Sequence, residues 1–147
     1  MKTALVLGTV VAAFVGGWVA SDFSQRSKAS IVEIAEASDF AVRMEKYRAS
    51  ARESEKTKAE QALWLQLGEQ LAFRRRNNPT FPADLLSIDA AYTYVRLSDL
   101  ARERGDQAAS LGLIKDAVAV CKQSKSVNCG AAELRKIMRV IDGKEKP

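Results

Sequence analysis

Residues 83–121 read ADLLSIDAAYTYVRLSDLARERGDQAASLGLIKDAVAVC, and this stretch sets the fold class. Its apolar residues return every three or four positions, which predicts helices rather than strands. Gly105 ends the first helix, and Asp106 is placed to cap the next one. The apolar side chains spaced for burial are Leu85, Ile88, Tyr92 and Val95 before the turn, and Leu111, Ile114, Val118 and Cys121 after it. The stretch therefore predicts a helical hairpin.

A further helix is predicted on each side of this hairpin. Residues 59–76 carry an apolar stripe, and the basic run Arg74–Arg76 followed by Asn77, Asn78 and Pro79 marks the helix end. Residues 131–141 have apolar side chains at the i, i+3, i+4, i+7 spacing of one helix face. The stripe, which is either core or a protein-interaction surface, comprises Leu63, Trp64, Leu67 and Leu71. These helices predict an all-α bundle of about four helices over residues 59–142, followed by a frayed tail at 143–147.

Residues 22–58 are predicted to form a polar linker and a charged stalk helix. Apolar residues fall at heptad a and d positions from Ile34 to Ala51, but Arg48 interrupts the pattern. Opposite charges three residues apart, such as Glu45 and Arg48, support a solvated helix. The pattern favours a short, partly paired stalk over a sustained coiled coil.

The N-terminal residues 1–21 are predicted to be a membrane anchor or a signal sequence. From Thr3 to Ala20 no residue is charged, and a helix over this segment would be about 27 Å long, just enough to cross a bilayer. Lys2 precedes the segment and Asp22 follows it, which favours a cytoplasmic N-terminus. The remaining chain would then be periplasmic or extracellular, at an inner or plasma membrane. A cleavable signal peptide is the competing interpretation.

Small residues return every fourth position in this apolar segment, which places them along one side of a helix. Such a ridge lets two membrane helices approach closely, so it predicts packing against a partner helix or a second copy. The alternative is that alanine and glycine are simply common in apolar segments. The ridge comprises Ala4, Gly8, Ala12, Gly16 and Ala20.

Composition argues against most catalytic classes. The chain has 147 residues, no histidine and a net charge of +5 at pH 7. Without histidine, histidine-dependent triads and common zinc sites are excluded, and no glycine-rich phosphate loop or serine nucleophile motif is present. We therefore expect no enzyme activity, no metal, no cofactor and no small-molecule substrate. The positive excess is diluted by acidic residues and lacks aromatic neighbours, so we expect no nucleic-acid partner.

The two cysteines, Cys121 and Cys129, flank a polar turn between the last two predicted helices. Such a turn can bring the thiols together, and in an oxidising compartment they would form a structural disulfide. Free buried thiols are the alternative. Two thiolates without histidine do not complete a zinc site within one chain, and the spacing is not that of a CxxC redox motif.

The segment Trp64-Leu65-Gln66-Leu67-Gly68-Glu69-Gln70-Leu71 resembles the W-x-x-L-G-x-x-Y opening of a tetratricopeptide repeat, with leucine at the tyrosine position. The likeness covers eight residues, since Pro79 and Pro82 interrupt the second half and no second copy follows at the repeat period. The hairpin around Gly105 and Asp106 resembles the same pattern loosely, with departures at Ala101 and Lys122. Membership of the family would imply a peptide-binding groove.

The architecture as a whole predicts a membrane-anchored helical subunit that mediates protein interaction or assembly in a bacterial-type envelope complex. Its expected partners are membrane lipid and either another protein or a second copy bound through the membrane helix. One alternative is a secreted, soluble helical binding module left after signal cleavage. Another is a lysis protein, because an inner-membrane anchor followed by charged helices resembles the plan of phage inner-membrane spanins.

Overall fold

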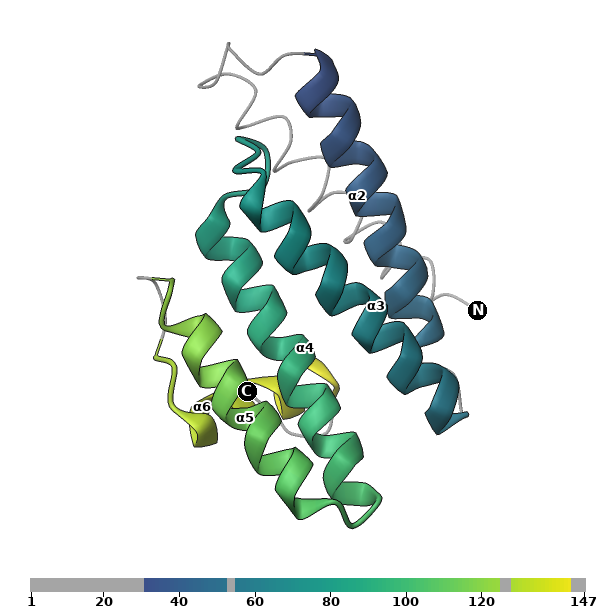
Figure 1. Ribbon diagram of the computed structural model, residues 1–147, viewed down its shortest axis with the longest axis vertical. Coiled ribbons are helices and arrows are strands. Elements are labelled where there is room, and N and C mark those ends of the chain that lie inside the picture. The colour runs from purple at the N-terminus through teal and green to yellow at the C-terminus, as the bar shows by residue number, and fades with distance from the viewer. Residues whose placement is uncertain (1–30, 53–54, 125–127, 144–147) are drawn as a thin grey trace. The chain divides into compact units, whose positions relative to one another are not determined.

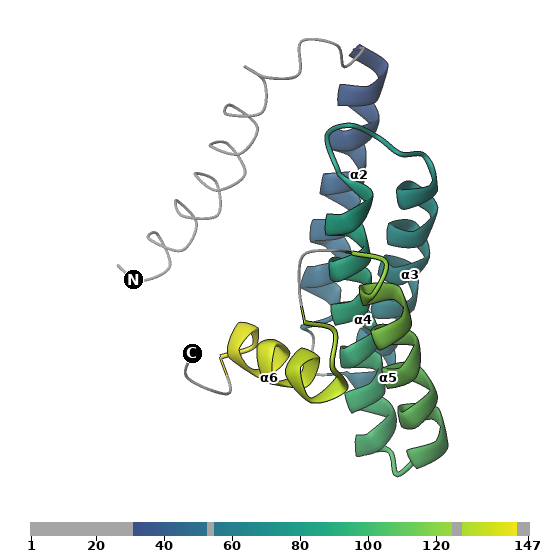
Figure 2. The ribbon, with the colours of Figure 1, turned by 90° about the vertical axis from the view of Figure 1, so that its left-hand side faces the viewer.

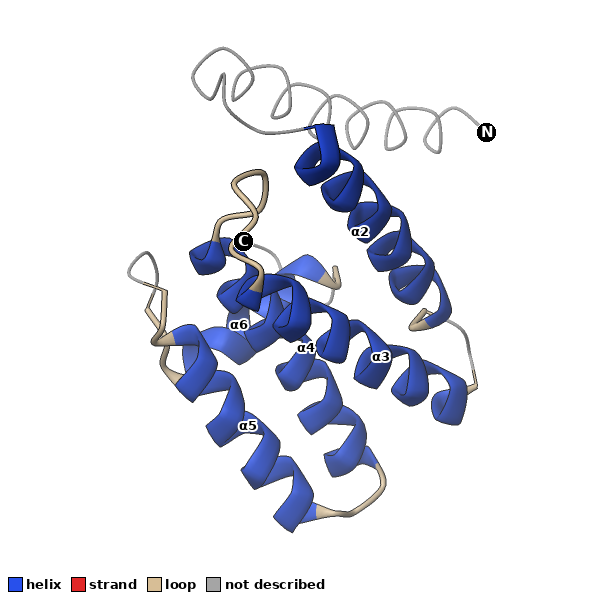
Figure 3. Cartoon of the chain, turned by 45° about the horizontal axis from the view of Figure 1, so that its top comes forward, coloured by secondary structure: helices blue, strands red, loops and turns tan. Residues whose placement is uncertain are grey.

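The computed structural model describes residues 31–52, 55–124 and 128–143. These residues form helices joined by loops and turns, with no strand among them (Figure 3). The helices are α2 (Ile31–Ser50), α3 (Lys56–Arg75), α4 (Ala83–Glu103), α5 (Gln107–Cys121) and α6 (Ala131–Ile141). The prediction of an all-α bundle is confirmed for this part of the chain.

The chain divides by its internal contacts into residues 1–32 and residues 33–147. Of the first unit, only Ile31 and Val32 at the start of α2 are described. The predicted membrane helix lies outside the described residues and stays a prediction. Among the helices that are described, none combines the length and the apolar character that crossing a membrane requires. The account below concerns the second unit.

Helix α4 lies at the centre of this unit and contacts α3, α5 and α6 (Figure 1). Because three helices surround it, residues all round α4 are buried, and many of them are small: Ser87, Ala90, Ala91, Ser98 and Ala101. The sequence prediction for the buried faces was partly wrong. Val95, Ile114 and Cys121 are buried as expected, but Leu85 is 41% exposed and Leu111 is 66% exposed.

The turn between α4 and α5 follows the sequence prediction closely. Gly105 has a φ of 83°, a left-handed conformation that glycine adopts at little cost. Asp106 caps α5, because its side-chain Oδ1 accepts a hydrogen bond of 2.9 Å from the backbone N–H of Ala109. The prediction of a helical hairpin is thus confirmed.

Helix α2 packs against α3 and α4 instead of standing apart as a stalk. The Phe40 ring stacks on Phe73 with centroids 4.2 Å apart, and it packs edge-to-face with Phe81 at a centroid distance of 5.3 Å. Ala37 and Met44, which are also buried, complete this second apolar cluster on the α2 side. Because Phe40 packs into this cluster, α2 belongs to the compact unit over residues 33–50. The stalk prediction rested on heptad positions, and Phe40 is not one of them.

Helix α6 crosses α4 and α5 at a steep angle (Figure 2). Its Leu134 and Met138 side chains are buried in the main core. Its Arg135 donates a hydrogen bond of 3.3 Å to the Ser98 hydroxyl on α4, and Arg96 of α4 pairs with Asp142 at 2.7 Å. Polar contacts therefore orient α6 around its two apolar anchors.

Candidate protein-interaction surface

Helix α3 buries one face against the bundle and leaves the other open to solvent. Its buried side chains are Ala59, Ala62, Leu63, Gln66, Leu67, Gln70 and Phe73. On the opposite side lie five exposed residues, which we call the outer face of α3: Gln61, Trp64, Leu65, Gly68 and Ala72. Trp64 is 47% exposed and Leu65 is 51% exposed, so two large apolar side chains stand in water next to two small ones.

The predicted apolar stripe is divided by this arrangement. Leu63 and Leu67 are 2% and 3% exposed, so they belong to the main core. Leu71 is partly buried against the same core, and Trp64 is the member left open to solvent. Ala72, which widens the predicted stripe, and Leu65 and Gly68, which sequence reasoning did not select, complete the exposed surface.

Gly68 leaves the helix backbone of the outer face open to solvent. A Cβ added at this position would meet no atom within 4 Å. Trp64 lies one turn earlier on the helix, and helical side chains lean toward the N-terminus, so its ring is directed away from Gly68. A glycine in the middle of an exposed helix lowers stability by about 0.5–1 kcal/mol relative to alanine. Nothing within the described unit uses the space that this glycine leaves.

The outer face is almost free of charge. Between Gln61 and Ala72 the single charged residue is Glu69, whose carboxylate lies 3.5 Å from the Arg43 guanidinium on α2. Glu69 is therefore directed toward α2 and away from the outer face. A solvated helix face normally carries charged side chains, and this one does not.

Three consecutive arginines, Arg74–Arg76, follow the outer face at the C-terminal end of α3. Within the described ranges none of the three pairs with a carboxylate, whereas Arg43, Arg48, Arg96, Arg102, Arg104 and Arg135 each do. Arg76 lies over the Phe73 ring at 5.9 Å. The three side chains complement the helix dipole and also leave positive charge at this end of the face.

A buried polar layer fixes the rotation of α3 about its axis. The Gln70 amide donates to the Asp89 carboxylate at 2.7 Å, and Arg48 of α2 donates to the same carboxylate at 3.3 Å. The Thr93 hydroxyl donates a hydrogen bond of 3.0 Å to the side-chain oxygen of Gln70, and it accepts one of 3.3 Å from the side-chain amide of Gln66. Because hydrogen bonds are directional, these contacts keep the opposite side of α3 facing outward.

Two tyrosines on α4 have raised pKa values. Burial raises the pKa of Tyr92, and the nearby Asp89 carboxylate adds to the effect. Burial likewise raises the pKa of Tyr94, with a further contribution from Asp116. Both phenols are thereby kept protonated well above neutral pH, so neither is tuned to act as a general base.

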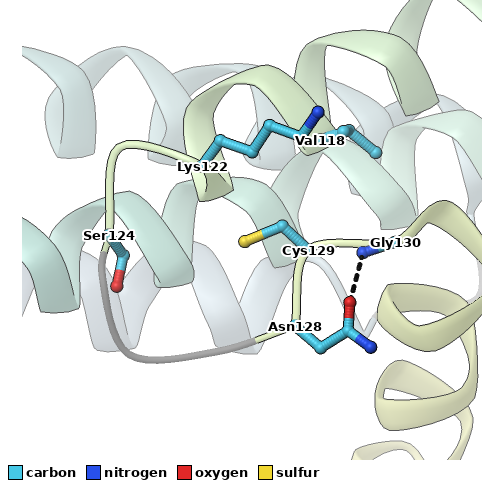
Figure 4. A pocket seen from close by; sticks show the side chains of 6 residues that line it. All are labelled: Val118, Lys122, Ser124, Asn128, Cys129 and Gly130. Carbon is cyan, nitrogen blue, oxygen red and sulfur yellow. Dashed lines mark hydrogen bonds between the residues drawn. The ribbon is translucent and has the colours of Figure 1, made fainter.

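Cys121 and Cys129 lie at disulfide distance, with Cα atoms 5.6 Å apart. The bridge joins the end of α5 to the segment before α6. Beside it lies an open pocket lined by Val118, Lys122, Ser124, Asn128, Cys129 and Gly130, in which the Asn128 Oδ1 accepts a hydrogen bond of 3.2 Å from the Gly130 N–H (Figure 4). Lys122 is the one ionisable side chain among the six, so the pocket brings no acid and base together.

The remaining site predictions concern the small-residue ridge and metal binding. The ridge residues Ala4, Gly8, Ala12, Gly16 and Ala20 lie outside the described residues, so their packing stays a prediction. In the described ranges, no three side chains of the metal-ligating types gather into one group. Comparison of the chain with protein-family models, curated proteins and solved structures gives no match.

Proposed function

We propose that this chain is a membrane-anchored helical subunit that binds another protein through the outer face of α3, in a bacterial-type envelope complex. The observation that carries the proposal is the exposure of Trp64 and Leu65 on a helix face without charge. Contiguous exposed apolar surface is unfavourable in water unless a partner covers it, and tryptophan is enriched among the residues that dominate binding energy.

The anchoring part of the proposal rests on the sequence of residues 3–20, which contains no charge. Lys2 before this segment favours a cytoplasmic N-terminus, which exports residues 22–147 to the periplasmic or extracellular side. The pairing of Cys121 with Cys129 supports that location, because disulfides persist in oxidising compartments. Lipid contact is then made by the anchor, and protein contact by the bundle.

The first experiment tests the anchor. Cells that express the chain are fractionated, and the intact mass of the product is taken without reduction, with and without thiol alkylation. A full-length membrane-bound product whose cysteines are alkylated only after reduction supports the proposal. A soluble product trimmed near residue 21 would identify a secreted binding module instead.

The second experiment tests the outer face of α3. A photo-crosslinking amino acid replaces Leu65 in one version of the full-length chain and Leu111 in another. Leu111 is the matched control because it is an exposed leucine, 66% open to solvent, on α5. The proposal expects a discrete protein adduct from position 65 and none from position 111. Equal crosslinking at both positions, or none at position 65, would contradict it.

A further inference from the structure

We infer that the Cys121–Cys129 disulfide is a redox switch that controls the docking of α6. While the bridge is intact, α6 stays docked on α4 and α5. A dithiol reductant that attacks Cys129 breaks the bridge and releases α6. The inference goes beyond the proposed function and does not depend on the contact proposed for α3. Two features carry it: the weak attachment of α6, and the unequal access of solvent to the two cysteines.

Helix α6 is attached to the bundle by few side chains. It has 11 residues, and an isolated helix of that length is marginally stable at best in water. It buries the side chains of Leu134 and Met138, whereas α4 buries nine. The buried Nε of Arg135 has no hydrogen-bond partner among the described residues, which weakens docking further. Docking of α6 therefore depends strongly on any covalent link that holds it near α4 and α5.

The disulfide is such a link. Cys121 is the last residue of α5, and α6 begins at Ala131, two residues after Cys129. With the bridge intact, an undocked α6 stays tethered through Cys129 to the main core. Without it, the tether is the whole segment 122–130, which has many more conformations. In the chain-entropy model, reduction of a loop of this size favours the undocked state by a factor of about 30–100.

The two cysteines differ in their access to solvent. Cys121 is 0% exposed and does not line the pocket beside the bridge, whereas Cys129 is 8% exposed and is one of the lining residues. Figure 4 shows the Cys129 side chain among the residues around this pocket. The rate of thiol–disulfide exchange depends on which sulfur an incoming thiolate can reach. The geometry therefore directs attack to Cys129 and makes Cys121 the leaving group.

The reaction is a thiol–disulfide exchange in two steps. In the first step, a thiolate of the dithiol bonds to the Cys129 sulfur, the bond between the two cysteines breaks, and Cys121 leaves as a thiolate that takes up a proton. In the second step, the other thiolate of the reductant attacks its own sulfur in the mixed disulfide and displaces Cys129, which also takes up a proton. The dithiol is oxidised to a disulfide, and the bridge is reduced to two thiols.

Release of α6 uncovers part of the main core. Leu134 and Met138 of α6 belong to the same apolar cluster as Leu97 of α4 and Val120 of α5. The surface that α6 covers on α4 and α5 is therefore opened to solvent when α6 leaves. The contacts of α4 with α3 and α5 do not involve α6, so we expect the rest of the bundle to stay folded.

The main test compares hydrogen–deuterium exchange in the full-length chain, in detergent micelles, with and without dithiothreitol. Amide exchange reports the population of locally open states. Exchange in α6 should accelerate by about 30–100-fold on reduction, and exchange in the central turns of α4 and α5 should change by less than about threefold. Unchanged exchange in α6 would overturn the inference, and so would equal acceleration in all three helices.

A chain without thiols is the matched control. Cys121→Ala combined with Cys129→Ala should show the α6 exchange of the reduced wild type, and dithiothreitol should not change it further. Slow exchange in its α4 and α5 verifies that the bundle is folded. If dithiothreitol accelerates α6 exchange in this variant as well, the reductant does not act through the bridge, and the inference is wrong.

Linkage gives a second test, which a bridge uncoupled from α6 docking would not pass. If the bridge favours docking, docking must favour the bridge by the same factor. Leu134→Ala removes a buried side chain of α6 and should shift the equilibrium of the bridge with a dithiothreitol redox buffer toward the thiols by at least about fivefold. Ile141→Ala is the matched control, because Ile141 on the same helix is 55% exposed, and it should shift this equilibrium by less than about twofold. Equal equilibria in wild type and Leu134→Ala would contradict the coupling.

Trapping of the mixed disulfide tests the site of attack. The oxidised full-length chain is exposed briefly to glutathione, and freed thiols are then alkylated with iodoacetamide. Peptide mass mapping should find glutathione on Cys129 and the alkyl group on Cys121. Glutathione found mainly on Cys121, or a bridge that glutathione and dithiothreitol reduce only after urea has unfolded the bundle, would refute attack through the pocket.

Discussion

The packing of α2 against α3 and α4 leads to a quantitative prediction for Phe40→Ala. Phe40 is 2% exposed, stacks on Phe73 with centroids 4.2 Å apart and packs edge-to-face with Phe81 at a centroid distance of 5.3 Å. Removing a buried phenylalanine costs about 3–5 kcal/mol, because transfer free energy is lost and a cavity remains. The stacked and edge-to-face ring contacts account for about 0.5–1.5 kcal/mol of this loss. We therefore expect a loss of about 4 kcal/mol in the free energy of unfolding of α2 from the bundle.

The effect should be local, because two apolar clusters hold the unit together. One joins α3, α4, α5 and α6, and the other contains Phe40 and holds α2. Hydrogen–deuterium exchange on the full-length chain in detergent micelles measures each helix separately. Since 1.4 kcal/mol is a factor of ten, exchange of α2 amides should accelerate by roughly 10³-fold, with much smaller changes in α4 and α5.

Val42→Ala provides the matched control on the same helix. Val42 is 54% exposed, so its substitution removes little buried surface and should change stability by no more than about 0.5 kcal/mol. A change of less than about 1 kcal/mol for Phe40→Ala would show that the aromatic cluster does not hold α2. Equal acceleration in α2, α4 and α5 would show that α2 does not open separately from the bundle.

Three further predictions concern stability. Reduction of the Cys121–Cys129 pair should lower the free energy of unfolding by about 2.5 kcal/mol, the chain-entropy value for so short a loop, as urea unfolding with and without reductant would measure. Asp89→Ala leaves the buried Gln70 amide and the partly exposed Arg48 guanidinium without this acceptor and should cost about 1–3 kcal/mol, measured in the same way. Raised pKa values of Tyr92 and Tyr94 mean that the folded chain holds protons which the unfolded chain has released. Stability should therefore fall as pH rises above 10.0, and Phe substitutions at both positions should reduce that fall.

Local signals in the sequence were sufficient to predict the helices. Apolar periodicity and the cap at Asp106 placed α5 and its turn correctly, and the last helix was predicted at its observed bounds, 131–141. These signals act within a few residues, because a cap bonds to its own helix and a positive φ belongs to one glycine. Sequence reasoning reads such signals directly.

The buried faces were harder to predict, because burial depends on contacts between distant residues. Leu85 and Leu111 were expected in the core by their size and spacing, yet both are exposed. The central position of α4 buries small residues such as Ala90 and Ser98, which allow neighbouring helices to approach. Similarly, Phe40 on α2 meets Phe73 on α3, and no local pattern joins two positions 33 residues apart.

The candidate surface was predicted only in part for the same reason. Spacing alone grouped Trp64 with Leu63 and Leu67, although the bundle separates them. A signal that identifies Leu65 and Gly68 does exist, in the near absence of charge from Gln61 to Ala72. That signal concerns the whole circumference of the helix, and a search for one apolar stripe does not detect it.

The composition of α3 also supports the proposal that its outer face binds another protein. A helix that is apolar on one side suits a surface position, whereas a helix without charge on either side suits complete burial. The middle of α3 has the second composition, since its one charge, Glu69, is taken up by Arg43 of α2. Among the residues that the structure describes, the bundle buries only one of the two sides of α3. This uncharged side, with Trp64 and Leu65 exposed on it, is the observation on which the proposed protein contact rests.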